Sequence, residues 1–198
     1  MSHPLLVCLA LLPQSLHRPM TQVQARLRQV DSRQLYNPPS TFHITIKPMG
    51  FVGTQVKERN VRRILQCIKD VALSTRPFDV RLDGLSAFPD VVYAKVTSGD
   101  DDIVRLNESL AESLKGMVIQ GKYEGRDMIP HVTLAHFTTS DVDELLAEVR
   151  RAGKLKIGEF RLDEFTVVKV SLKRYFGPRD ARASSFDRVA SFPFGSAL

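Results

Sequence analysis

The sequence predicts an antiparallel α+β fold with two similar halves, and three observations support this prediction. Two short segments, residues 42–46 and 130–134, are almost the same: each has a histidine and a threonine two residues apart, set between apolar residues. The order of elements around both segments is also alike, with a loop, the histidine-threonine strand, a short connection and an amphipathic helix. The remaining strand-like segments alternate well, which favours hairpins over a doubly wound parallel sheet.

The composition is that of an ordinary globular domain with a net positive charge. The chain has 198 residues, of which 43% are hydrophobic and 25% are charged, enough for one domain of two lobes that share a core. A formal net charge of +6 favours an anionic partner such as nucleic acid or a phosphorylated small molecule. Cys8 and Cys67 have no metal-type or redox-type spacing, so we expect free thiols in a reducing cytoplasm. We expect a monomer that does not contact membranes.

The first half contains the first histidine-threonine strand. Residues 5–12 form an apolar run too short for a membrane span, which predicts a core strand rather than a signal peptide. Pro19 suits the first turn of a helix, and apolar residues follow it at helical spacing. Residues 37–40, Asn-Pro-Pro-Ser, predict a loop before the motif strand at about residues 42–47.

A helix and two strands link the first motif to the second half. Thr54 can cap a helix that carries its apolar face over residues 61–72. Residues 78–82 alternate between apolar and charged side chains, as in a half-buried strand. Residues 91–96 predict a further strand after a Phe-Pro-Asp turn.

The second half repeats the order of the first. Helical spacing over residues 103–114 is followed by a polar, glycine-containing loop at residues 121–128. The second motif strand covers residues 131–136, and a helix with apolar positions over residues 142–149 comes next. The tail supplies two or three strands, at residues 157–162, 165–172 and 186–192.

The paired motifs carry acid–base chemistry. Residues i and i+2 of a strand share a face, so His43 and Thr45 point one way, as do His131 and Thr133. Two facing imidazoles can serve as acid and base in phosphodiester cleavage, because histidine titrates near neutrality. The threonine hydroxyls can donate hydrogen bonds to phosphate oxygens. This scheme needs no metal and no cofactor, and the sequence has no metal-ligand spacing.

Residues 43–46 and 131–134 resemble the paired His-x-Thr-x motifs of the 2H phosphoesterase superfamily. The resemblance is strongest to its branch of RNA 2′,3′-cyclic phosphodiesterases, also named 2′-5′ RNA ligases. Residues 88–94, Phe-Pro-Asp-Val-Val-Tyr-Ala, and the final Phe-Pro-Phe at residues 192–194 also fit this branch. The likeness therefore extends over nearly the whole chain.

The resemblance implies a bilobal, pseudo-symmetric fold in which two antiparallel sheets with flanking helices surround a central cleft. It implies metal-independent opening of a 2′,3′-cyclic phosphate on RNA to leave a 2′-phosphate, and the same site could run in reverse as a ligase. By this resemblance His43 protonates the leaving 3′ oxygen and His131 activates the attacking water. Thr45 and Thr133 would hold the phosphate.

Some positions depart from the family pattern or lie outside its motifs. The family commonly has an arginine where this chain has His136, and strand alternation places His136 away from the cleft. Alternation places Lys47 on the cleft side, as a nucleotide contact or as a solvated lysine at the rim. Arg126 precedes the second motif, and Tyr175 lies among basic residues that could track a nucleotide backbone. These basic residues are Lys173, Arg174 and Arg179.

Two alternatives to RNA cyclic phosphodiesterase activity stay open. The same site could cleave 2′-5′ linkages or a cyclic phosphate on a small nucleotide such as an ADP-ribose derivative. A non-catalytic RNA-binding module with this fold is the other alternative, although simple binding does not require both imidazoles.

Overall fold

The computed structural model describes residues 3–119, 125–171 and 186–195. Within these ranges the strands are β1 (Leu5–Leu11), β2 (Leu35–Tyr36), β3 (His43–Phe51), β4 (Phe78–Phe88), β5 (Val91–Ser98), β6 (His131–His136), β7 (Lys156–Leu162), β8 (Glu164–Val170) and β9 (Asp187–Pro193). The helices there are α1 (Gln14–Val30), α2 (Val61–Ser74), α3 (Asp100–Ser113) and α4 (Asp143–Arg151), with short 3₁₀ turns η1 (Pro39–Thr41), η2 (Glu58–Asn60) and η3 (Gly125–Asp127).

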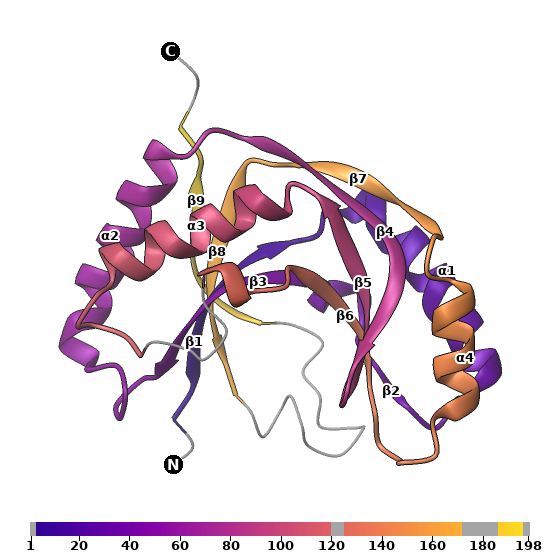
Figure 1. Ribbon diagram of the computed structural model, residues 1–198. Coiled ribbons are helices and arrows are strands. Elements are labelled where there is room, and N and C mark those ends of the chain that lie inside the picture. The colour runs from indigo at the N-terminus through magenta and orange to yellow at the C-terminus, as the bar shows by residue number, and fades with distance from the viewer. Residues whose placement is uncertain (1–2, 120–124, 172–185, 196–198) are drawn as a thin grey trace.

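The strands form one curled antiparallel sheet in the order β7-β4-β5-β6-β3-β1-β8-β9, with β2 paired to β6 (Figure 1). The predicted antiparallel α+β class is confirmed. The two sheets that we expected are two halves of this sheet, joined where β3 meets β6. At this junction Ile44 and Val132 are the register partners, and so short a pairing lets the two halves diverge on either side of it.

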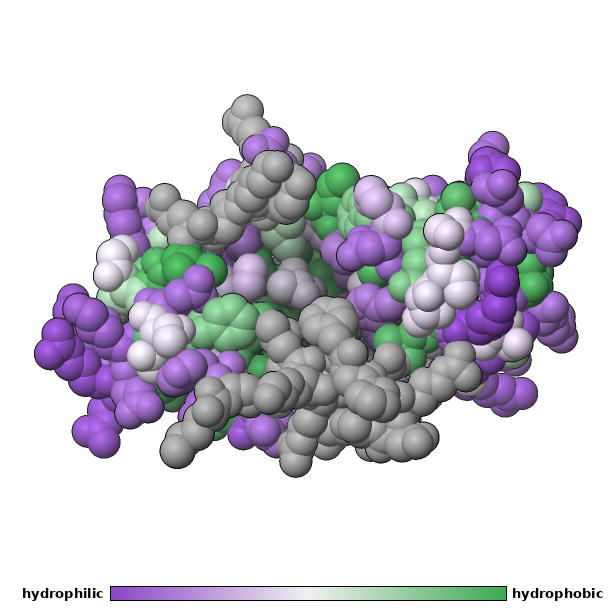
Figure 2. All heavy atoms as spheres, turned by 90° about the horizontal axis from the view of Figure 1, so that it is seen from below, coloured by the Kyte–Doolittle hydropathy of each residue, from purple (hydrophilic) through white to green (hydrophobic). Residues whose placement is uncertain are grey.

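Each half of the sheet has its own pair of helices. Helices α2 and α3 pack against each other, α2 contacts β9 and α3 contacts β3. Helices α1 and α4 pack against each other and contact β7 and β4, at the other end of the sheet (Figure 1). The apolar faces of all four helices join one core cluster with the strands. Seen from below, the molecule has a hollow between two hydrophilic flanks, with hydrophobic residues in and beside it (Figure 2).

Two predicted helix starts are wrong. Helix α1 begins at Gln14, so Pro19 lies inside the helix and not in its first turn. A proline there removes one backbone hydrogen bond, but burial of Leu16 and Met20 on the same face outweighs this loss. Thr54 does not cap α2, because that helix begins at Val61, directly after η2.

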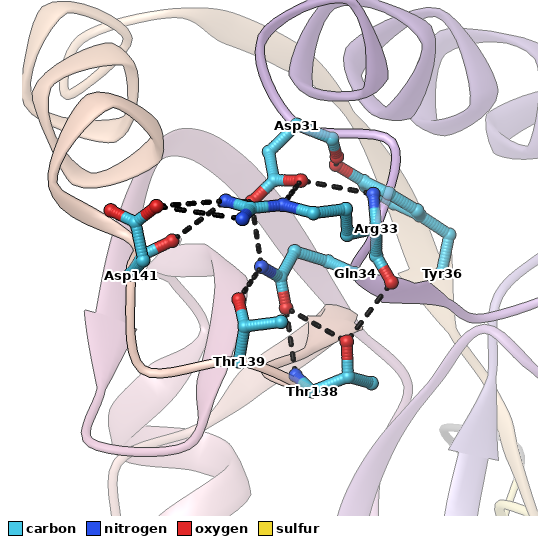
Figure 3. Close-up of polar contacts among 7 residues, drawn as sticks. All are labelled: Asp31, Arg33, Gln34, Tyr36, Thr138, Thr139 and Asp141. Atoms are coloured by element: carbon cyan, nitrogen blue, oxygen red, sulfur yellow. Dashed lines mark hydrogen bonds and ion pairs between the residues drawn. The ribbon is translucent and has the colours of Figure 1, made fainter.

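A polar network ties the end of α1 to the connection between β6 and α4 (Figure 3). The Arg33 guanidinium donates to the Asp31 carboxylate at 2.9 Å and 3.0 Å, and to the backbone carbonyl of Asp141 at 2.9 Å. The Gln34 side chain donates to Asp31 and accepts from the backbone N–H of Thr138, both at 2.7 Å. The bonds to Arg33 and Gln34 hold the pKa of the Asp31 carboxyl well below its usual range. This network fixes the strand end that follows the second motif.

Candidate active site

The two motif strands, β3 and β6, are neighbours that meet at Ile44 and Val132. Both of these side chains are fully buried in the core. Because successive residues of a strand point to opposite faces, the motif histidines and threonines lie on the opposite, open face. The antiparallel register places each motif histidine across from the threonine of the other motif, so that His43 lies across from Thr133. The four residues singled out by the sequence therefore gather at one point of the sheet.

Each motif strand has a β-bulge directly after its threonine. The extra residue is Ile46 in β3 and Leu134 in β6, the fourth residue of each motif. A bulge leaves backbone groups without a ladder partner, and here a buried side-chain amide from a helix supplies one. Asn107 on α3 donates to the carbonyl of Ile46 at 2.7 Å, and Gln24 on α1 donates to the carbonyl of Leu134 at 2.8 Å. Equivalent bonds therefore hold the two motifs in the same local shape.

The bulges place two predicted residues on faces opposite to those that strict alternation predicted. Lys47 is the register partner of Cys8, a core residue, and is itself fully buried, so it is not a solvated lysine at a cleft rim. His136 is the partner of Val91 on β5, and its charge contributes to lowering the pKa of His43. His136 therefore lies on the side of the motif histidines and not away from them. The alternation was wrong because each bulge shifts the side-chain order by one residue.

The two histidines have the same hydrogen bond. The Nδ1 atom of His43 lies 2.7 Å from the Thr41 carbonyl, and that of His131 lies 2.7 Å from the Ile129 carbonyl, in each case two residues earlier. Because a carbonyl only accepts, Nδ1 carries the proton in both rings. In the neutral form each Nε2 therefore has a free lone pair. Neither Nε2 has a hydrogen-bond partner among the residues that the structure describes.

Aromatic side chains border both imidazoles. The His43 ring meets Phe186 edge-on, with ring centroids 5.1 Å apart. His131 is 5.1 Å from Phe88 and 5.1 Å from Tyr93, and these two rings stack on each other at 4.4 Å. These contacts limit how far each imidazole can rotate. They also remove water from around it.

Burial lowers the pKa of both histidines, because desolvation penalises the charged imidazolium. The pKa of His43 falls to about 4, with smaller contributions from the charges of His131 and His136, against an opposing contribution from its carbonyl partner. Burial also lowers the pKa of His131, but the carboxylate of Asp90 and the carbonyl partner of the ring oppose this shift. Both lowered pKa values therefore favour neutral imidazoles at pH 7 in the free protein, and Asp90 opposes only part of the shift at His131.

The hydroxyls of Thr45 and Thr133 are free to bind a ligand: they have no hydrogen bond with any residue in ranges 3–119, 125–171 and 186–195. Both residues are half-buried on the open face. Arg126 lies in η3, close in sequence to His131, and its side chain is outside what the structure describes. Tyr175 and the basic residues near it also lie outside the described residues.

Residues 3–119, 125–171 and 186–195 contain no group of three or more His, Cys, Asp or Glu side chains arranged to hold a metal ion. None of the described helices is long and apolar enough to cross a membrane.

Several residues around the motifs were not predicted from the sequence. Asp90 follows the residues Phe88 and Pro89 in the β4–β5 turn, and it reaches the site because β5 pairs with β6. Asn107 looked like an ordinary helix residue, although a polar side chain within an apolar helical face was a usable signal. Ile129 is an apolar residue with 56% of its surface exposed, two positions before His131.

The chain resembles known proteins in sequence. Residues 12–174 match the profile of a family described as the 2′-5′ RNA ligase superfamily. A protein named RNA 2′,3′-cyclic phosphodiesterase from Methanothermobacter thermautotrophicus is 27% identical over 82% of this chain and 85% of its own length. A protein of the same name from Aquifex aeolicus is 21% identical over 68% of this chain and 71% of its own length.

Solved structures share the fold. The protein TT0787 of Thermus thermophilus superposes with a TM-score of 0.70 at 19% identity, covering 98% of this chain and 100% of TT0787. LigT of E. coli, crystallised with 3′-AMP, also gives a TM-score of 0.70, at 14% identity over 98% of this chain and 99% of LigT. The arrangement of sheet and helices is thus common to these proteins.

Proposed function

Because the chain belongs to the 2′-5′ RNA ligase superfamily, we propose that it hydrolyses 2′,3′-cyclic phosphates at RNA ends to 2′-phosphates. His43 and His131 form the acid–base pair in this proposal, and no metal takes part. The names of the two curated relatives, both RNA 2′,3′-cyclic phosphodiesterases, support the choice of reaction.

The observation that carries the proposal is the matched environment of the two imidazoles. Each ring is held through Nδ1 by the carbonyl two residues earlier, which leaves Nε2 to exchange a proton with the substrate. The strands that bear them adjoin at Ile44 and Val132, so both rings lie on one face within reach of one ligand. A pair of purely structural histidines would not need two free Nε2 atoms on the same face.

The proposed reaction is an in-line displacement at phosphorus. Nε2 of His131 takes a proton from water as the water oxygen bonds to phosphorus. The bond between phosphorus and the 3′ oxygen breaks, and Nε2 of His43 donates its proton to that oxygen. The products are a 2′-phosphate and a free 3′-hydroxyl, and each proton-transfer role is worth about 10²–10⁴ in rate. These two roles follow the family resemblance.

The site can hold the phosphate and supply the missing proton. Thr45 and Thr133 project from opposite strands toward the face of the histidines, and their hydroxyls can donate to non-bridging oxygens. His43 is neutral in the free protein, but an adjacent phosphate anion favours its imidazolium and raises its pKa. The phosphate of the bound substrate therefore favours the protonated form of His43, which is the form that acts as the acid.

The same geometry supports 2′-5′ ligation. If a 5′-hydroxyl of a second RNA takes the position of water, attack on the cyclic phosphate produces a 2′-5′ linkage and again frees the 3′-hydroxyl. In this reaction run backwards, the 3′ oxygen attacks the phosphorus of a 2′-5′ linkage and the 5′ oxygen leaves, which gives a 2′,3′-cyclic phosphate and a free 5′-hydroxyl. Both activities therefore belong to one site. Water at high concentration favours net hydrolysis.

The test is incubation of the protein with an RNA that ends in a 2′,3′-cyclic phosphate, in excess chelator. The proposal expects complete conversion to the 2′-phosphate, identified by ³¹P NMR against authentic 2′- and 3′-phosphate standards. Formation of the 3′-phosphate would contradict the assigned leaving group. Tight RNA binding without product would instead indicate a non-catalytic binding module.

A further inference from the structure

A cavity of about 480 Å³ lies directly beside the two motifs. Thr45 from the first motif and His131 from the second both line it, together with the β4–β5 turn and η3. Its volume is within the range of roughly 300–1,000 Å³ that is typical of sites for small organic ligands. A molecule bound at the motif residues can therefore extend into this cavity.

Asn107 builds one wall of the cavity. Its Nδ2 donates to the Ile46 carbonyl at 2.7 Å, and its Oδ1 accepts from the backbone N–H of Gly125 at 2.9 Å. The residue is 1% exposed, so both bonds are shielded from water. Through them, one side chain joins the first motif strand to η3, the turn that precedes the second motif. These two sides of the cavity are therefore fixed in position relative to each other.

Most of the cavity wall is apolar and partly flat. Phe88 and Pro89 contribute one side, and Pro48, Met128 and Ile129 contribute the others. The Phe88 ring is fixed by its stacking on Tyr93, at 4.4 Å between centroids. Ile129, which also lines the cavity, is 56% exposed and so offers apolar surface to a ligand. Such walls fit a planar aromatic group.

The charged groups that line the cavity disfavour a second phosphate. Asp90 and Asp127 both line the cavity and are exposed, and neither carboxylate bonds to another residue in the part of the chain that the structure describes. Carboxylates repel phosphate but accept hydrogen bonds from N–H groups. The cavity thus combines flat apolar walls with unpartnered acceptors, beside a site for an anion.

We propose that this cavity binds the nucleobase of the nucleotide that carries the cyclic phosphate, and that Asp90 and Asp127 select bases with an amino group. The inference rests on the function proposed above, and it names the substrates that the site prefers. Only the ribose separates the base from the cyclic phosphate, so a phosphate at His131 puts the base at the cavity. Cytosine, adenine and guanine present an amino donor, whereas uracil presents a carbonyl oxygen in place of the cytosine amino group.

Cytosine and uracil give the sharpest comparison because they have the same size and stacking area. The experiment measures kcat/KM for cytidine and uridine 2′,3′-cyclic phosphates. We expect cytidine to be preferred about tenfold, the effect of one hydrogen bond to a charged group. In the double variant Asp90→Asn, Asp127→Asn the ratio should fall to one or below, because an amide can also donate to the uracil oxygen.

The result is read from the ratio of the two kcat/KM values because Asp90 also affects the pKa of His131. A change in the chemical step that is the same for both nucleotides cancels in this ratio. Asp101→Asn is the matched control: it removes an exposed carboxylate that does not line the cavity, and it should keep the wild-type ratio. A wild-type ratio near one, or an unchanged ratio in the double variant, would overturn the base assignment.

Failure of the proposed function gives a different result. In that case none of the four nucleoside 2′,3′-cyclic phosphates is hydrolysed. The base preference is then measured by calorimetry, as the ratio of the dissociation constants of cytidine and uridine 2′-phosphates. A ratio of about ten that is lost in the double variant supports the cavity assignment even without turnover, and a ratio of one rejects it.

Discussion

The side-chain amide of Asn107 donates a 2.7 Å hydrogen bond to the backbone carbonyl of Ile46, the extra residue of the bulge in the first motif strand. Gln24 makes the equivalent bond to Leu134 in the second motif strand. Both amides are 1% exposed. Two helices, one from each half of the molecule, thus fix the same position of the two motifs.

Replacement of Asn107 by Ala should therefore affect both stability and activity. The buried carbonyl of Ile46 would lose its donor, which costs about 1–3 kcal/mol of unfolding free energy. We expect kcat to fall about tenfold as well, because Thr45 would no longer be held in place. Urea unfolding and steady-state kinetics measure the two effects. Gln66→Ala, an exposed amide on α2, is the control and should change unfolding by less than about 0.5 kcal/mol.

Acid should destabilise the protein partly through His43. The pKa of this residue falls from 6.5 in the unfolded chain to about 4 in the fold, so between these values the unfolded chain binds a proton that the folded chain does not. Stability is therefore lost as the pH decreases from about 6.5 toward 4. We expect the drop in unfolding free energy between pH 7.5 and 4.5 to be about 2 kcal/mol smaller in His43→Asn than in the wild type. An identical drop in the two proteins would show that His43 does not resist protonation.

The Asp31 network should matter for stability more than for chemistry. The Asp31 carboxylate is only 6% exposed and accepts from Arg33 and Gln34, and its lowered pKa means that these bonds favour the charged form. Asp31→Asn should cost about 2 kcal/mol in urea unfolding. The control is Asp141→Asn, because Asp141 is 82% exposed and its ion pair contributes less than about 1 kcal/mol. Equal losses in both variants would contradict a special role for Asp31.

The separate roles of the two histidines can be tested with a better leaving group. A nitrophenolate leaves phosphorus without being protonated, so hydrolysis of bis(p-nitrophenyl) phosphate does not require the general acid. Only the cyclic phosphate needs the acid, so the fall in activity caused by His43→Ala should be at least tenfold smaller with this ester than with a cyclic phosphate. His131→Ala should lose similar activity on both substrates. The opposite pattern would show that His131 is the general acid and His43 the general base.

The sequence predicted much of the fold because local patterns determined it. Alternation located most strands, helical spacing located the helices, and the duplicated motif indicated the two strands, β3 and β6, that adjoin in the sheet. The helix start at Pro19 was wrong because tertiary burial of Leu16 and Met20 outweighs the local cost of a proline.

The faces of Lys47 and His136 were not predictable by the same means. A β-bulge depends on which strand lies alongside and on a distant donor for the bulge carbonyl, here Asn107 or Gln24. Neither of these can be read from the five residues of a motif. The position of Asp90 likewise depends on the pairing of β5 with β6.

The most direct test of the two-histidine account compares single variants of His43 and His131 on a cyclic-phosphate RNA in excess chelator. His43→Ala and His131→Ala should each lower kcat by about 10²–10⁴ while keeping the melting temperature within a few degrees of the wild type or above it. His17→Gln, which changes an imidazole outside the site, should retain wild-type kcat. Activity close to that of the wild type in either alanine variant, or activity abolished by the chelator alone, would contradict the account.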